Sequence, residues 1–303
     1  MPYTIFKCPD GGQIPIDECL NKGCRLAGKI NPVTGLPYVP CGRCLSTSTL
    51  RTLSKQREWK GQPSTTQCLR GTRESYLMLT HDYAVNPKDM MFALFGTQTH
   101  ANLEKGMDTE AGEVGEQRLS DGVSNGAFDF YSPENGGTLF DYKTYSSFVV
   151  AKYLGIQGKK VMVGHYKNGK PKFKTVFTYD NVRHDFDLAV QMNDYRMKIE
   201  KVLHLPVNKM VCEMIVRDGG TYMAKSRGVY DSAYLIEVGR ISDWWMEKYM
   251  KRKAGDLIRA LDSNQAPPPC RPHECWHGQK CEKFCPVNQF CDAYKGDNNN
   301  DTR

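Results

Sequence analysis

Two aspartates and a lysine stand in a pattern typical of metal-assisted cleavage of a phosphodiester. Asp129 ends the segment 126–129, and the run Asp141-Tyr142-Lys143 follows after eleven intervening residues. Two carboxylates suit Mg²⁺ or Mn²⁺, which prefer oxygen ligands, and a bound cation lowers the pKa of a water molecule. Because side chains alternate along a strand, Asp141 and Lys143 would share one face. The alternative interpretation is two ordinary acids at strand ends and a solvated lysine.

Further polar residues flank this pair in chain order. His100 lies late in a helix predicted for residues 86–105, and Gln191 and Tyr195 lie four apart on a helix predicted from Asp185. Residues four apart share a helix face. Each of them alone is more typical of an ordinary helix surface than of a substrate contact. The order His, Asp, Asp-x-Lys and Gln-x-x-x-Tyr is what indicates one shared site.

The middle of the chain has the pattern of an α/β domain, which must position these residues. Alternating and apolar runs, the Asn168-Gly169 turn and an apolar stripe at helical spacing predict the elements. The predicted strands are 126–131, 138–145, 161–167, 171–179 and 209–216, and a final helix covers 242–262. We therefore predict three parts: a Cys-rich module at 1–60, a core at 61–265 and a Cys-rich tail at 266–303.

Twelve cysteines are clustered rather than spread over the 303 residues. Five lie within residues 8–44 and five within 270–291, which leaves Cys68 and Cys212 between them. Residues 1–10 have no signal-peptide core, and no apolar run approaches the ~18 residues that a membrane span needs. We therefore expect a cytoplasmic protein without membrane contact, in which closely spaced thiols bind metal rather than form disulfides. Cys212 lies in an apolar strand and is predicted to fill the core.

The amino-terminal cysteines predict a Zn²⁺ site. Two close pairs separated by a loop suit tetrahedral zinc, and the predicted ligands are Cys19, Cys24, Cys41 and Cys44. Cys8 would be spare or would replace one of them. The module could be structural, or it could bind DNA or a partner protein.

A basic segment predicts where nucleic acid would bind. The formal net charge is +7, and residues 142–179 contain eight lysines and no Asp or Glu. Lysines interleaved with Tyr166, Phe173 and Phe177 could follow a phosphate backbone and stack on bases. The alternative is a solvated edge hairpin whose lysines prevent aggregation.

Taken together, the ordered residues resemble the RecB-like branch of the PD-(D/E)xK nuclease superfamily, over roughly residues 64–291. The resemblance implies an α/β fold with a restriction-endonuclease-like core, in which helices flank a central mixed sheet. It also implies roles for individual residues. His100, Asp129, Asp141 and the Tyr142 carbonyl would hold Mg²⁺ or Mn²⁺, Lys143 would activate water, Gln191 and Tyr195 would orient the DNA backbone, and Glu116 would assist.

The cysteines on either side of the core add to this resemblance. They are similar to those of RecB-like nucleases closed by a 4Fe–4S cluster, such as the CRISPR-associated exonucleases and the AddAB-type helicase–nucleases. The likeness implies four thiolate ligands: Cys68, Cys281, Cys285 and Cys291. The spacing departs from the usual C-x2-C-x5-C, so two further possibilities stay open. Cys270 and Cys275, with His273 and His277 nearby, could replace a ligand or bind a separate Zn²⁺.

From these observations we expect a metal-dependent DNA exonuclease of recombination, repair, phage DNA metabolism or CRISPR-type processing. The setting would be a prokaryotic or phage-infected cell, with a helicase, recombinase or integrase as candidate partner. By resemblance, a histidine ligand such as His100 accompanies exonucleases. The alternatives are a structure-specific endonuclease of the same family and a non-catalytic DNA-binding or scaffold protein with metal modules.

Overall fold

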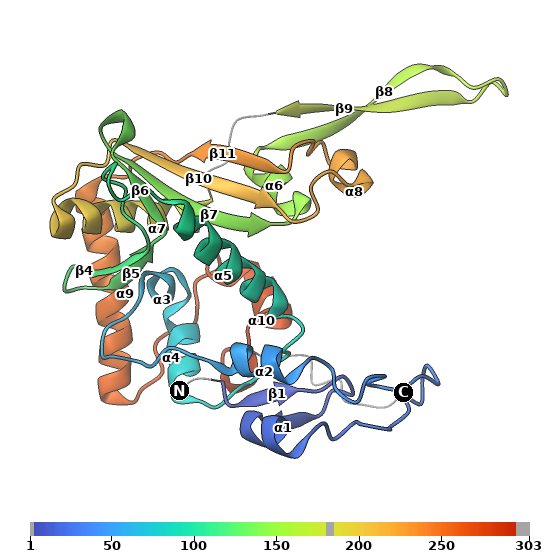
Figure 1. Ribbon diagram of the computed structural model, residues 1–303, viewed down its shortest axis with the longest axis horizontal. Helices are drawn as coiled ribbons and strands as arrows, with labels where there is room; N and C mark the ends of the chain where they lie inside the picture. The colour runs from blue at the N-terminus through green and yellow to red at the C-terminus, as the bar shows by residue number, and fades with distance from the viewer. Residues whose placement is uncertain (1–2, 180–184, 295–303) are drawn as a thin grey trace. The chain divides into compact units, whose positions relative to one another are not determined.

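The structure is a computed structural model that describes residues 3–179 and 185–294. It is a mixed α/β protein with several sheets, and its chain divides into two units. The sheet unit comprises residues 96–248, and the terminal unit comprises residues 1–95 and 249–303. Figure 1 labels their elements. No helix in the described ranges is both long enough and apolar enough to cross a bilayer.

The sheet unit is built on a four-stranded sheet in the order β11-β10-β7-β6. Its strands are β6 (Phe130–Ser132), β7 (Thr138–Tyr145), β10 (Lys209–Val216) and β11 (Ala233–Glu237). β7 and β10 are parallel, whereas β6 and β11 pair antiparallel with their neighbours. The predicted strands 138–145 and 209–216 are confirmed with these bounds, and Cys212 is a core residue as predicted.

The strand predicted for residues 126–131 is broken at Asp129. β5 (Asn125–Phe128) pairs with β4 (Gln117–Ser120) in a separate two-stranded sheet, whereas β6 pairs with β7. The Asp129 carboxylate accepts a hydrogen bond from the backbone N–H of Tyr142 at 2.8 Å. At the break, this side-chain hydrogen bond replaces a backbone hydrogen bond between the strands. This position leaves Asp129 in the connection between two sheets rather than within a strand.

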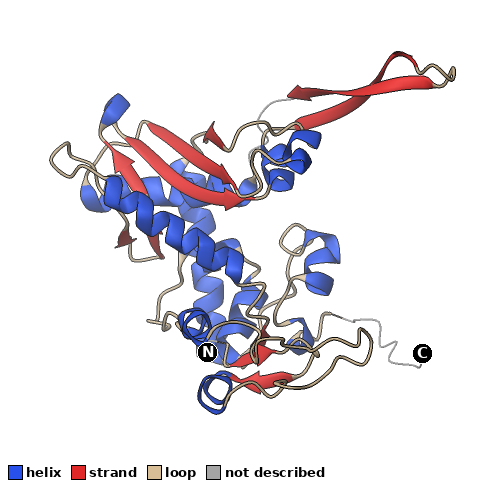
Figure 2. Cartoon of the chain, turned by 45° about the vertical axis from the view of Figure 1, so that its right-hand side comes forward, coloured by secondary structure: helices blue, strands red, loops and turns tan. Residues whose placement is uncertain are grey.

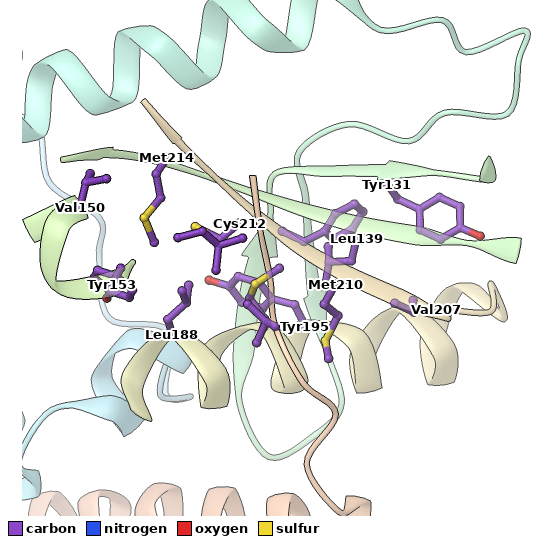
Figure 3. Packing of buried hydrophobic residues seen from close by; sticks show 14 of the residues in the cluster. Tyr131, Leu139, Val150, Tyr153, Leu188, Tyr195, Val207, Met210, Cys212 and Met214 are labelled. Carbon is purple, nitrogen blue, oxygen red and sulfur yellow. The ribbon is translucent and has the colours of Figure 1, made fainter. Parts of the chain in front are cut away.

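The helix α7 (Phe186–Lys198) packs its apolar stripe against the sheet. Asp185 caps it as predicted, and Leu188, Met192, Tyr195 and Ile199 are buried. Figure 3 shows Leu188 and Tyr195 of this helix among the strand residues Met210, Cys212 and Met214. Val202, which the stripe also predicted, is 40% exposed. The helix widens to a π-type turn over Ile199–Leu203, and this change of period rotates Val202 off the buried face.

The predicted hairpin is present and longer than expected. β8 (Ile156–His165) begins before the predicted residue 161 and pairs antiparallel with β9 (Pro171–Tyr179). Gly169 has φ +79°, which the turn requires and which glycine adopts without strain. Figures 1 and 2 both show the two strands as a ribbon that extends away from the four-stranded sheet of the same unit. The helices α6 (Ser147–Tyr153) and α8 (Tyr222–Ser226) lie in this unit as well.

The helix that carries His100 starts later than predicted. α5 covers Met91–Leu103 rather than residues 86–105, and the short 3₁₀ turn Glu104–Gly106 follows it. The Asn86 side chain accepts the N–H of Lys88, so it closes a tight turn before the helix instead of capping the helix.

The terminal unit contains a small sheet in the order β2-β1-β3. Its strands are β1 (Ile5–Lys7), β2 (Gln13–Pro15) and β3 (Ala84–Val85), with helices α1 (Ile16–Lys22) and α2 (Thr47–Ser54) following in the amino-terminal part. The polar segment that includes α2 is helical because Leu50 and Leu53, three residues apart, are both buried.

Residues from the two ends of the chain meet inside the terminal unit. Tyr76 and Leu77 of α4 (Thr72–Thr80) pack with Leu257 and Ala260 of α9 (Asp243–Ser263) and with Val287. The remaining short elements are the helices α3 (Thr65–Leu69) and α10 (Gln279–Lys283) and the 3₁₀ turns Glu134–Gly136, Trp276–Gly278 and Asn288–Phe290.

Ion pairs join the same two segments. Lys253 lies 2.7 Å from Glu274 and donates to the backbone carbonyl of Arg70, while Lys280 lies 2.5 Å from Glu74. The segment around α4 is therefore tied to the carboxy-terminal tail by both apolar packing and charge.

Candidate functional site

Strand pairing brings the two aspartates of the sheet unit together. Phe130 of β6 pairs with Phe140 of β7, so Asp129, one residue earlier, lies beside Asp141, one residue later. Along β7 the side chains alternate, so Asp141 and Lys143 lie on the face that carries the buried Leu139. Local alternation and cross-strand register together create the site.

His100 of α5 joins this pair. Its Nδ1 lies 3.2 Å from Asp129 Oδ1, and its Nε2 lies 2.8 Å from the carbonyl oxygen of Tyr142. The hydrogen bond to Asp129 raises the pKa of His100, although burial opposes the charged form. With an acceptor facing each ring nitrogen, the environment favours an imidazolium that donates both protons.

Asp141 and Lys143 form an ion pair in which the carboxylate is buried and the lysine is partly exposed. Asp141 is 1% exposed, and its Oδ2 contacts the ammonium of Lys143. Burial raises the pKa of the Asp141 carboxyl, and the positive charge of Lys143 acts in the opposite direction. Burial disfavours the charged form of Lys143, but attraction to Asp141 and Asp129 outweighs it and raises the pKa of Lys143. The lysine is thus held as a cation against two carboxylates.

α7 brings Gln191 and Tyr195 to the same region. Gln191 Nε2 donates to the Tyr195 hydroxyl at 3.0 Å. Burial raises the pKa of Tyr195, and the negative charge of Asp141 raises it further, which keeps the phenol protonated beside the carboxylates. Figure 3 shows Tyr195 pointing from the helix toward the strands.

Aromatic rings cover the opposite face of β7. The Tyr142 ring stacks on Phe130 with centroids 6.5 Å apart, and Phe130 also contacts Phe140 at 5.5 Å. Burial, followed by the negative charges of Glu213, Asp129 and Glu113, raises the pKa of Tyr142 to about 12. Stacking therefore fixes the ring of Tyr142, the residue whose backbone carbonyl faces His100.

Two acids ahead of the sheet differ in their placement. Glu116 is exposed in the loop before β4. Glu113, three residues earlier, accepts the backbone N–H of Asp108 at 2.8 Å, and its charge reaches the Tyr142 ring. Spacing along the chain did not distinguish these two acids, because both precede the same strand.

The residues near Asp129 include the ligand types that Mg²⁺ and Mn²⁺ bind: two carboxylates, an imidazole and a backbone carbonyl. In the conformation described these groups contact one another. His100 contacts both the Asp129 carboxylate and the Tyr142 carbonyl, and the ammonium of Lys143 pairs with the Asp141 carboxylate. In residues 3–179 and 185–294 as placed, the His, Cys, Asp and Glu side chains form no group of three or more that could hold a metal ion. The donors fit a hard cation in kind, and an incoming cation would replace these pairings.

The hairpin presents lysines and apolar side chains to solvent. Lys159, Lys172 and Lys174 are exposed, and so are Phe173 and Met162, each more than half accessible. The Lys172 ammonium lies 5.9 Å from the centre of the Tyr166 ring, a cation–π contact near the turn.

Five cysteines of the tail line one cavity in the terminal unit. The cavity has a volume of about 230 Å³ and is lined by Cys270, Cys275, Cys281, Cys285 and Cys291, together with residues of α4 such as Glu74 and Leu77. Burial, then the nearby thiols of Cys275 and Cys270, raise the pKa of Cys281 to about 11. A metal that binds thiolates would offset this cost of ionisation.

Three other residues that the sequence offered as ligands do not line this cavity. Cys68 is 1% exposed within α3 and does not line this cavity, and His273 and His277 are exposed. The thiols that meet in the tail are therefore the three expected from the resemblance together with Cys270 and Cys275, which the sequence had left open.

A second pocket of the terminal unit is lined by Cys8, Cys19, Cys24 and Cys44. Burial, then the thiol of Cys44 and more weakly those of Cys8 and Cys24, raise the pKa of Cys19, against the charge of Arg43. Cys41 is exposed and lies outside the lining of this pocket.

Comparison with known proteins adds little to this description. No family model and no curated protein matches the chain. The crystal structure of SSO0001 is similar, with 13% sequence identity and a TM-score of 0.40 over 81% of this chain and 92% of that chain. A likeness at this level assigns neither fold family nor function.

Proposed function

We propose that the protein is a metal-dependent deoxyribonuclease with a PD-(D/E)xK-type core. The observation that carries the proposal is the meeting of His100, Asp129, Asp141 and Lys143, which come from a helix, a strand connection and a strand. A partly buried lysine cation beside two carboxylates, one of them fully buried, is expensive to maintain without a function, since these charges lose much of their hydration. Clustering of such perturbed groups is typical of active sites.

Each residue has a role that its contacts support. Asp129, Asp141, His100 and the Tyr142 carbonyl would bind the cation, which supplies Lewis-acid activation of water and neutralises charge on the phosphate. Lys143 would hold the attacking water or a phosphate oxygen once a cation takes its place beside Asp141. The Gln191–Tyr195 pair would donate hydrogen bonds to the DNA backbone, because the raised pKa of Tyr195 keeps its proton in place.

The hairpin supports DNA as the substrate. Its lysines can neutralise phosphates, and its exposed aromatic side chains can stack on unpaired bases. The contacts that these residue types offer are to backbone and base faces, so we propose recognition of strand ends rather than of sequence. An exonuclease is therefore the first proposal and a structure-specific endonuclease of the same family the second.

Cleavage of labelled DNA tests the activity. We expect the wild-type chain with Mn²⁺ or Mg²⁺ to degrade end-labelled DNA, and Lys143→Ala to reduce the rate by ~100-fold or more, as for loss of a group that handles the proton. Asp129→Asn should have a similar effect through loss of the cation. Glu237→Gln serves as the matched control, because that acid is an exposed surface residue of the same unit.

The outcome separates the alternatives. Degradation of linear DNA with circular single-stranded and plasmid DNA left intact supports the exonuclease, and nicking of circles supports the endonuclease. Wild type and Lys143→Ala that bind DNA equally and are both inert with either metal would show a non-catalytic DNA-binding protein.

We also propose that the tail cavity holds a 4Fe–4S cluster. Thiolates are the ligands of such clusters, and five cysteines from about twenty residues of chain line one cavity. The cluster would be structural, because its cavity is lined by both the tail and α4, and it would tie these two segments of the terminal unit together.

A further inference from the structure

The amino-terminal pocket is assembled from four separate pieces of the chain. Cys8 follows β1 in a tight turn, in which its N–H donates to the Gly12 carbonyl at 2.7 Å and Gly11 donates to its carbonyl at 2.9 Å. Cys19 lies on α1, Cys24 follows that helix, and Cys44 precedes α2. The small sheet and its two helices therefore bring together cysteines that are up to 36 positions apart.

The size of this pocket suits a single ion. Its volume is about 10 Å³, close to the space of one water-sized sphere, whereas the tail cavity measures about 230 Å³. None of Cys8, Cys19, Cys24 and Cys44 forms a disulfide, and Cys8, Cys19 and Cys44 pack in the local apolar cluster. Four free thiols around a space for one ion match the ligand number of a closed structural zinc site.

Backbone contacts explain why Cys44 lines this pocket and Cys41 does not. The guanidinium of Arg43 donates to the carbonyl of Cys19 at 2.8 Å, which anchors the residue next to Cys44 against α1. Gly42 has φ +78° and donates to the Val39 carbonyl in a tight turn. Cys41 lies within this turn and is exposed, although it is only three residues from Cys44.

We propose that Cys8, Cys19, Cys24 and Cys44 bind one Zn²⁺ and that Cys41 is not a ligand. This set differs from the two close pairs that spacing alone favours, because Cys8 takes the place of Cys41. Binding would draw the four side chains inward from their described positions and release their thiol protons. The side chains of Arg25, which lines the pocket, and Arg43 provide positive charge beside the four thiolates.

Zinc would be structural in this module. Among the described residues, the buried members of the apolar cluster around the pocket are Phe6, Ile14, Cys19 and Leu50. A core of that size contributes little stability, and small modules of this kind rely on metal to fold.

Two matched cysteine variants of the full chain test the proposal. We expect Cys8→Ser to lose one zinc ion per chain relative to wild type after purification with zinc present, and Cys41→Ser to retain it. Metal in the tail is common to all three proteins and cancels in the comparison. Equal loss in both variants, or retention in both, would overturn the proposed ligand set.

A measurement on the wild-type chain covers the case in which Cys8→Ser does not fold. Iodoacetamide labelling followed by mass spectrometry should show that Cys8 reacts slowly until a chelator removes zinc, while Cys41 reacts rapidly with and without the chelator. Labelling of Cys8 that is unaffected by the chelator would overturn the proposal. Neither experiment depends on nuclease activity.

Discussion

The site residues of the sheet unit are held by one another in the absence of a cation. The imidazole of His100 contacts Asp129 and Tyr142, and Lys143 contacts Asp141, so each charge has a partner of opposite sign or a hydrogen-bond acceptor. This arrangement keeps the side chains proposed as metal ligands close to one another. It also means that the metal-free site has a measurable dependence on pH.

His100 gives the residue-scale prediction. Its pKa is raised above the usual ~6.5, first by the hydrogen bond to Asp129. Its stabilising contribution is therefore fully present below that value and is lost as pH rises through the higher pKa of the folded state. In chelator, we expect His100→Gln to lower the free energy of unfolding most at acidic pH, by on the order of 1–3 kcal/mol for a charge-assisted hydrogen bond. The loss would be seen as a lower melting temperature.

The matched control for this measurement is His165→Gln, since His165 is exposed at the end of β8. Thermal melts of the three proteins from mildly acidic to mildly alkaline pH give the comparison. A deficit in His100→Gln that stays constant over the whole range would contradict the assigned charge state.

At the scale of elements, the β8–β9 hairpin carries the exposed lysines that we propose to contact DNA. Cross-strand pairing of Val161 with Lys174 puts that lysine on the same face as Lys159, and Lys172 follows on the same face of β9. Like charges in a row on one face repel one another, so an anionic partner such as the proposed DNA would stabilise them. In the alternative interpretation, the lysines would only keep the exposed edges of the hairpin from pairing with other chains.

The element-scale prediction separates these two roles. We expect replacement of Lys159, Lys172 and Lys174 together by Gln to weaken DNA binding and to lower the slope of log affinity against log salt by about 2–3. The charge-matched control replaces Lys29, Lys55 and Lys60, which are exposed in the terminal unit. Titration of fluorescent DNA at several salt concentrations provides the measurement. An equal loss in both triple variants would show that only net charge matters.

At the scale of the whole molecule, contacts within the terminal unit join residues about two hundred positions apart. Arg73 donates to the Pro267 carbonyl at 2.6 Å and contacts the carboxylate of Asp292. Closing so long a loop costs chain entropy, and a cluster that fixes the tail would reduce the freedom of the unfolded chain. The proposed cluster would therefore stabilise the connection between the two ends of the chain.

The ligands of the cluster give the prediction at this scale. We expect Cys275→Ser, purified anaerobically, to lose iron and sulfide and to melt at a lower temperature than wild type, because Cys275 lines the cavity and its thiol is next to Cys281. Cys68→Ser is the comparison, since Cys68 does not line the cavity. Loss of iron in Cys68→Ser with retention in Cys275→Ser would instead support the ligand set that the resemblance implied.

What the sequence determined by itself is local. The strands 138–145 and 209–216, the Asn168-Gly169 hairpin and most of the buried stripe of α7 follow from alternation, turn chemistry and helical spacing, which depend on neighbours along the chain. The shared face of Asp141 and Lys143 follows from the same alternation. The PD-(D/E)xK fold, the metals and DNA cleavage remain predictions.

Only the tertiary structure decided which distant residues meet. The break at Asp129 depends on a hydrogen bond to Tyr142 across two strands. Spacing along the chain cannot show that Cys8 lines a pocket from which Cys41 is absent, because the path between them is set by packing of the small sheet on its helices. The reason is physical: short-range geometry is encoded by adjacent residues, whereas the membership of a site depends on contacts that form only when the chain is folded.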